Sequence, residues 1–165
     1  MPVTRDITAT YLRPRRVIRR QLASGIGEDR ALMYVMLACG LIFVGQWPRL
    51  SREAHLDPEV PLNALMGGSL MGWIFIAPLM FYLLAAVSHL LLRPLGGRGN
   101  WFSNRLALFW ALLASVPLWL IWGVVNGFAH GSVAVQVVGA LALAAFLALW
   151  GLCLRAAEFP DGAPQ

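Results

Sequence analysis

The densest group of chemically active side chains lies near the start of the chain, where residues 11–25 read YLRPRRVIRRQLASG. The arginines of this segment are Arg13, Arg15, Arg16, Arg19 and Arg20. Pro14 suits the first turn of a helix, on which Val17, Ile18 and Leu22 would form an apolar stripe. The pattern predicts an interfacial amphipathic helix whose arginines meet anionic lipid headgroups. The residues predicted to bind lipid or a partner are Arg15, Arg16, Arg19 and Arg20; the alternative is that they only set the membrane topology.

Other side chains capable of chemistry are few and scattered. His89 falls near one end of an apolar run, whereas His55 and His130 lie outside the runs, so no two histidines share a depth suited to a haem. The two cysteines, Cys39 and Cys153, cannot by themselves supply a zinc or iron–sulfur site. No Ser–His or paired-carboxylate arrangement shares a depth. We therefore expect no metal site, no cofactor and no enzymatic activity.

The composition indicates what kind of fold must position these side chains. Of the 165 residues, 59% are hydrophobic and 13% are charged, against roughly 45–50% and about 25% in soluble domains. Four apolar runs occur, at about 31–48, 67–92, 106–128 and 133–154. A span needs about 20 such residues, and its backbone must form its hydrogen bonds internally. We therefore predict an all-α polytopic transmembrane bundle of four spans.

The remaining segments and the arginines predict how the bundle is oriented. Residues 1–30 form a basic segment and residues 155–165 a short tail. With four spans, eleven of the thirteen arginines fall on the side of both termini, and only Arg49 and Arg52 on the other. Arginine-rich loops stay on the cytoplasmic side, so we expect both termini there. Because the arginines flank apolar runs, the net charge of +5 favours lipid over nucleic acid as the partner.

Two prolines fall within the predicted spans. Pro78 lies in the second run and Pro117 in the third. Each removes a backbone hydrogen bond and is expected to kink its helix. A static kink and a functional hinge both remain open.

Small residues recur at a spacing of four. Gly68 with Gly72 and Gly123 with Gly127 form two GxxxG pairs. Such pairs let helices approach closely, either within one chain or between two. The sequence leaves open packing within the monomer, a homo-oligomer or docking to another membrane protein.

The second connector carries a resemblance to a known family. Gly96, Gly97, Arg98 and Gly99 are followed by Asn100-Trp101-Phe102, ahead of a run with a central proline. This order resembles the Yip1-domain signature, and the segment from Pro14 to Arg20 is similar to bacterial Yip1-type proteins. The resemblance implies an inner-membrane protein without catalytic residues. It also implies five spans where the arginine count favours four, so a fifth remains open.

Taken together, the sequence predicts a non-enzymatic membrane protein of Yip1 type in the bacterial inner membrane. It would organise the bilayer, or bind lipid or a partner, through its basic amino-terminal segment and helix faces. Two alternatives remain: a passive channel or permease, and an accessory subunit of a larger membrane complex.

Overall fold

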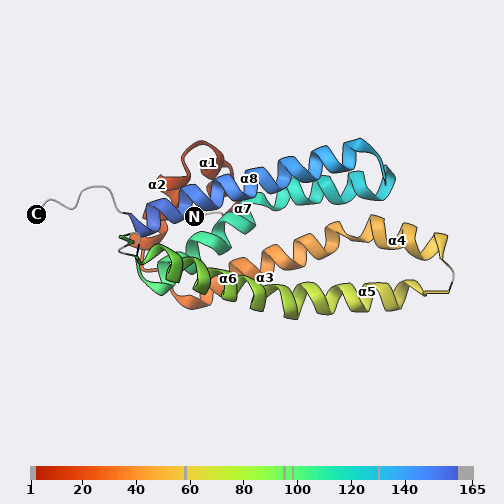
Figure 1. Ribbon diagram of the computed structural model, residues 1–165, viewed down its shortest axis with the longest axis horizontal. Coiled ribbons are helices and arrows are strands. Elements are labelled where there is room, and N and C mark those ends of the chain that lie inside the picture. The colour runs from red at the N-terminus through yellow and green to blue at the C-terminus, as the bar shows by residue number, and fades with distance from the viewer. Residues whose placement is uncertain (1–2, 58, 95, 98, 130, 160–165) are drawn as a thin grey trace, which may run out of the picture.

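The computed structural model describes residues 3–57, 59–94, 96–97, 99–129 and 131–159, and these form an all-helical bundle (Figure 1). Four helical stretches are long and apolar enough to cross a membrane. They are Glu28–Leu56, Leu62–Leu92, Trp101–Phe128 and Val133–Glu158. The predicted fold class, an all-α bundle with four membrane-spanning stretches, is confirmed.

The individual helices divide these stretches at prolines and glycines. Two short helices, α1 (Val3–Leu12) and α2 (Pro14–Ala23), precede the first stretch. The first stretch contains α3 (Glu28–Gly45) and α4 (Trp47–Leu56). The second contains α5 (Leu62–Met71), the π-helical turn η1 (Gly72–Ile76) and α6 (Ala77–Leu92). The third and fourth are single helices, α7 (Trp101–Phe128) and α8 (Val133–Glu158).

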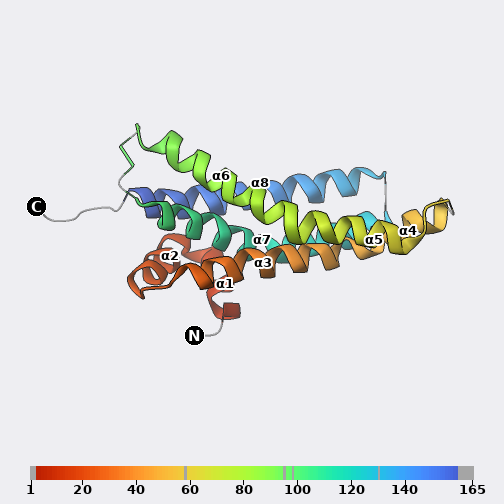
Figure 2. The same cartoon turned by 90° about the horizontal axis from the view of Figure 1, so that it is seen from below.

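The first half of α7 is the centre of the bundle. Every residue from 106 to 116 is buried, so this helix is covered on all sides. Helices α3, α6 and α8 pack against it, and the α1–α2 pair covers part of the remaining surface (Figures 1 and 2). The core therefore lies nearer to the end of the bundle at which α7 begins.

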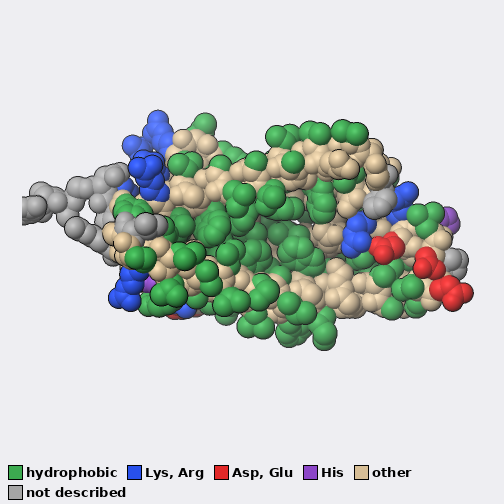
Figure 3. All heavy atoms as spheres, viewed as in Figure 1, with side chains coloured by type: hydrophobic (Ala, Val, Ile, Leu, Met, Phe, Trp, Pro, Cys, Tyr) green, Lys and Arg blue, Asp and Glu red, His purple; other side chains and the backbone are tan. Residues whose placement is uncertain are grey.

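The opposite half of the bundle is more loosely covered. None of the residues of α5 or η1 is buried, and α8 makes most of its contacts with α7 and α2. Large apolar side chains are consequently exposed along these helices, as the space-filling view shows (Figure 3). Apolar surface of this extent is stable when hydrocarbon replaces water around it.

Charged side chains gather at the two ends of the bundle (Figure 3). We call the end that carries α2, the start of α3 and the end of α8 the basic end. Arg49 and Arg52 lie on α4, which extends toward the other end. The bundle therefore has an apolar middle between two charged ends, as a membrane protein requires.

The helices extend beyond the apolar runs from which the spans were predicted. The second stretch begins at Leu62 rather than near residue 67, and the third at Trp101 rather than 106. The fourth continues to Glu158, so the first four residues of the predicted tail are helical. Hydropathy marks where a helix enters lipid, whereas backbone hydrogen bonding continues through the polar interface.

The two prolines have different surroundings. Pro78 lies in the first turn of α6, directly after η1. The wider π turn accommodates a residue that cannot donate to the preceding turn. Pro117 lies inside the continuous helix α7, which bends along its length (Figure 1). The fully buried part of α7 ends directly before Pro117.

Candidate functional site

The basic segment forms a helix that docks onto the bundle. Pro14 is the first residue of α2, as its position in the sequence suggested, and the helix ends before Gly25, whose φ is +67°. Val17, Ile18 and Gln21 are buried, and α2 packs mainly against α8. The apolar stripe thus faces protein in place of lipid, which fixes the position of the helix backbone that carries the arginines.

The four predicted lipid-binding arginines do not share one environment. Arg15, Arg16 and Arg19 are exposed. Arg20 is also exposed but forms an ion pair with Asp6 of α1. A groove of about 350 Å³ lies beside them and is lined by three arginines and three apolar residues. Its lining residues are Ala9, Leu12, Arg13, Arg16, Val17 and Arg20.

Helix α1 ties this basic surface to the centre of the bundle. The Tyr11 hydroxyl donates to the Ala114 carbonyl at 2.7 Å, and the Trp110 indole donates to Thr10 Oγ1 at 3.0 Å. Burial raises the pKa of the Tyr11 phenol, which keeps it a neutral donor. Ala114 lies thirteen residues into α7, about 20 Å along its axis at 1.5 Å per residue. The amino-terminal helices are therefore part of the folded bundle.

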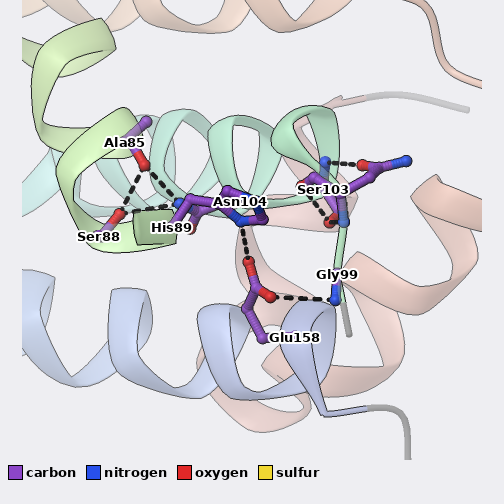
Figure 4. Close-up of polar contacts among 8 residues, drawn as sticks. Ala85, Ser88, His89, Gly99, Ser103, Asn104 and Glu158 are labelled. Atoms are coloured by element: carbon purple, nitrogen blue, oxygen red, sulfur yellow. Dashed lines mark hydrogen bonds and ion pairs between the residues drawn. The ribbon is translucent and has the colours of Figure 1, made fainter. Parts of the chain in front are cut away.

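A second polar site lies at the basic end, where α6, α8 and the 93–100 connector meet (Figure 4). His89 Nδ1 lies 3.0 Å from Glu158 Oε1, and the backbone N–H of Gly99 donates to Glu158 Oε2 at 3.0 Å. The two side chains are only 4% and 1% exposed. When Glu158 is ionised its carboxylate can only accept, and the histidine then donates from Nδ1. We call these residues, together with Gly97, the connector cluster.

Neighbouring hydrogen bonds fix the start of α7 beside the connector cluster. Asn100 and Ser103 form a reciprocal capping box, which satisfies the first N–H groups of the helix. Asn104 donates to the Ala85 carbonyl and to Ser88 Oγ, joining α7 to α6 (Figure 4). These bonds hold the connector between two packed helices.

The connector glycines are needed for different reasons. Gly96 has a φ of +88°, which disfavours any side chain. A Cβ on Gly97 or Gly99 would lie 2.8 Å or 2.7 Å from Glu158 Oε2. The predicted motif residue Arg98 lies outside the described residues. The glycine-rich sequence therefore lets the backbone approach a buried carboxylate.

This close approach predicts the effect of Gly99→Ala. The new methyl group would also lie 2.9 Å from the Ala157 carbonyl, so backbone must move. We expect a loss of about 1–3 kcal/mol in the free energy of unfolding in detergent. Gly151→Ala is the matched control, since it lies in α8 with nothing within 4 Å. Equal stability of the two variants would contradict the close packing.

The connector cluster joins α6, α8 and the connector through polar contacts. Its acid and imidazole are both buried. The nearby Ser88 hydroxyl donates to the Ala85 carbonyl rather than facing His89. Within the part of the chain that the structure describes, no three His, Cys, Asp or Glu side chains are grouped to hold a metal ion.

Sequence reasoning placed the basic helix but missed the connector cluster. The sequence places Glu158 in the tail and His89 near one end of an apolar run, and no local pattern joins residues that are 69 positions apart. No spacing in the sequence indicated the hydrogen bonds of Asn104 to α6 or of Tyr11 to α7 either. The one signal that could have suggested the cluster was a glycine-rich connector next to a span that ends in a histidine.

No protein-family model, curated protein or solved structure is significantly similar to this chain.

Proposed function

We propose that this chain is a non-enzymatic integral membrane protein of Yip1 type, in the bacterial inner membrane, that binds anionic lipid through the exposed face of α2. The observation that carries the proposal is the docking of α2. Its apolar residues are buried against the bundle, while Arg15 and Arg16 are exposed. A docked helix holds the backbone positions of these arginines fixed before they meet a phosphate, which lowers the entropic cost of binding.

The distribution of charge supports both the site and its orientation. Arginine dominates at the basic end, which also carries both termini of the membrane-spanning part. A positive cytoplasmic side is the usual arrangement, and the cytoplasmic leaflet carries the negative surface potential that attracts arginine. The resemblance to Yip1-type proteins includes the glycine-rich connector. Its glycines let the backbone approach Glu158 closely, which is a physical reason for glycine at these positions.

Neutralising Arg15 and Arg16 tests the proposal. In Arg15→Gln/Arg16→Gln we expect affinity for anionic lipid to fall about tenfold or more, since each arginine near an anionic surface contributes about 1 kcal/mol. The measurement is the enrichment of anionic over zwitterionic lipid around the protein in mixed nanodiscs, at low and high salt. Salt should weaken the wild-type enrichment.

The matched control is Arg49→Gln/Arg52→Gln, which removes the same charge from the other end. Arg49 forms an ion pair with Glu53 and donates to Gln46 Oε1, both at a partly exposed site, so we expect its loss to cost about 1 kcal/mol or less. Equal loss of enrichment in both double variants would show that net charge, and not α2, determines lipid binding. An unchanged enrichment in the α2 variant would overturn the proposal.

A further inference from the structure

A polar pocket of about 520 Å³ lies between α1, α2 and the start of α3. It is separate from the exposed arginine face, although Arg20 contributes to both. Its lining residues are Asp6, Arg20, Gln21, Ser24, Ile26, Arg30, Met33 and Tyr34. Two arginines, an acid, an amide and a phenol therefore line one open pocket at the basic end.

One buried polar atom of the pocket lining has no partner among the described residues. Gln21 is 4% exposed, yet its Oε1 atom has no hydrogen-bond partner. The neighbouring Ser24 hydroxyl donates to the Gln21 backbone carbonyl and not to this side-chain oxygen. A buried polar atom without a partner costs about 1–3 kcal/mol. Such a cost at the wall of a pocket points to a ligand that supplies the missing hydrogen bonds.

The charges of the pocket indicate a ligand with one negative charge. Arg20 is paired with Asp6, whose side chain is 16% exposed. Arg30 is exposed, and no acidic residue in the described part of the chain forms an ion pair with it. One uncompensated guanidinium thus faces the space. A phosphodiester carries one negative charge and accepts from such a group.

The position of the pocket indicates a lipid rather than a soluble phosphate. Arg30 is the third residue of α3, at the start of the first membrane-spanning stretch. Met33 lines the pocket, and Leu37 follows it one turn deeper; both are about half exposed. Positions i and i+4 share one helix face, so an acyl chain can continue along them. A headgroup in the pocket would therefore leave its chains in the hydrocarbon layer.

The hydrogen-bonding groups select among phospholipids. Gln21 and Asp6 can accept hydrogen bonds from a headgroup that carries hydroxyls. A choline headgroup has no donor, and an ethanolamine headgroup would place a third cation beside Arg20 and Arg30. We infer that this pocket binds phosphatidylglycerol, with its phosphate on Arg30 and its glycerol hydroxyls toward Gln21 and Asp6. The inference rests on the proposed function, which it narrows to one lipid at one site.

Binding of dioctanoyl phosphatidylglycerol to delipidated protein in neutral detergent, measured by native mass spectrometry, tests the inference. We expect Arg30→Gln to weaken binding about tenfold, because it removes a charge-assisted contact. Tyr34→Phe keeps the ring packed on Trp110 but removes the phenol, and should weaken binding about threefold. The control is Arg93→Gln, which removes an exposed arginine at the same end, outside the pocket, and should bind as wild type does.

Comparing ligands and variants separates the outcomes. Wild-type protein that binds the ethanolamine or choline analogue as tightly as the glycerol lipid overturns the inference, as does equally tight binding of free glycerol 3-phosphate. If Arg30→Gln binds like wild type while Arg15→Gln/Arg16→Gln loses anionic lipid, the pocket assignment is wrong and the proposed function stands. If neither variant loses lipid, both are wrong.

Discussion

Replacement of Glu158 by alanine is expected to cost about 3–5 kcal/mol in the free energy of unfolding, the largest loss among the substitutions considered. The carboxylate is buried and accepts from both His89 and the Gly99 backbone. Its removal leaves one buried donor, on His89, and one partly buried donor, the Gly99 N–H, without a partner. The measurement is equilibrium unfolding of the purified protein in mixed micelles with increasing SDS.

The position of Glu158 makes these partners more important. It is the last residue of α8, where the helix dipole disfavours a negative charge. The imidazole and the connector N–H must therefore offset both burial and an unfavourable dipole. The bond between Glu158 and the Gly99 N–H also holds the connector against α8. Loss of the Glu158 carboxylate should therefore release the connector as well as destabilise the bundle.

Two further variants distinguish this explanation from simple loss of volume. Glu158→Gln keeps the shape and one acceptor oxygen, so it should fall between wild type and Glu158→Ala. His89→Phe/Glu158→Leu removes both partners and should recover part of the lost stability, because apolar groups leave no unpaired charge. If Glu158→Leu alone is as stable as the double variant, the His89 contact contributes nothing.

The sequence predicted the features that depend on hydropathy and local spacing. Four spans followed from runs of apolar residues, and the start of α2 followed from Pro14. Both depend on residues close together in the chain. The arginines of α2 were recognised in the same way, although the pairing of Arg20 with Asp6 was not.

What the sequence could not predict depends on contacts between distant segments. The connector glycines are tied to Glu158, about 60 residues away, and the pocket joins Asp6 to Arg30 across two helices. Such contacts have no local periodicity. The small-residue motifs could not be interpreted from the sequence for the same reason. A GxxxG pair does not show which helix, if any, packs against it.

The structure distinguishes the two GxxxG pairs. A Cβ on Gly123 would lie 2.1 Å from the Gly45 carbonyl oxygen of α3, and one on Gly127 would lie 2.3 Å from Pro48 Cβ. Gly68 and Gly72 have nothing within 4 Å and line an open groove of about 640 Å³ beside α4. Gly123 and Gly127 therefore pack helices against each other within the monomer.

This difference predicts opposite effects of the same substitution. Gly123→Ala must push apart the backbones of α3 and α7, so we expect a loss of about 2–3 kcal/mol in the same SDS titration. Gly68→Ala/Gly72→Ala should be neutral or more stable, since alanine is favoured over glycine in a helix by up to about 1 kcal/mol. The first variant adds one methyl group and the second adds two, so the double variant would be the more damaging if the neighbouring atoms did not decide the outcome.

The variant Gly68→Ala/Gly72→Ala also tests whether the protein self-associates. If Gly68→Ala/Gly72→Ala lowers stability, the two glycines must pack against something outside the monomer, because no described atom lies near them. Cross-linking before and after the substitution would then identify a second copy, which close glycine contacts between helices permit. If stability and cross-linking both stay unchanged, lipid covers this groove, and the pair formed by Gly68 of α5 and Gly72 of η1 has no role in helix packing.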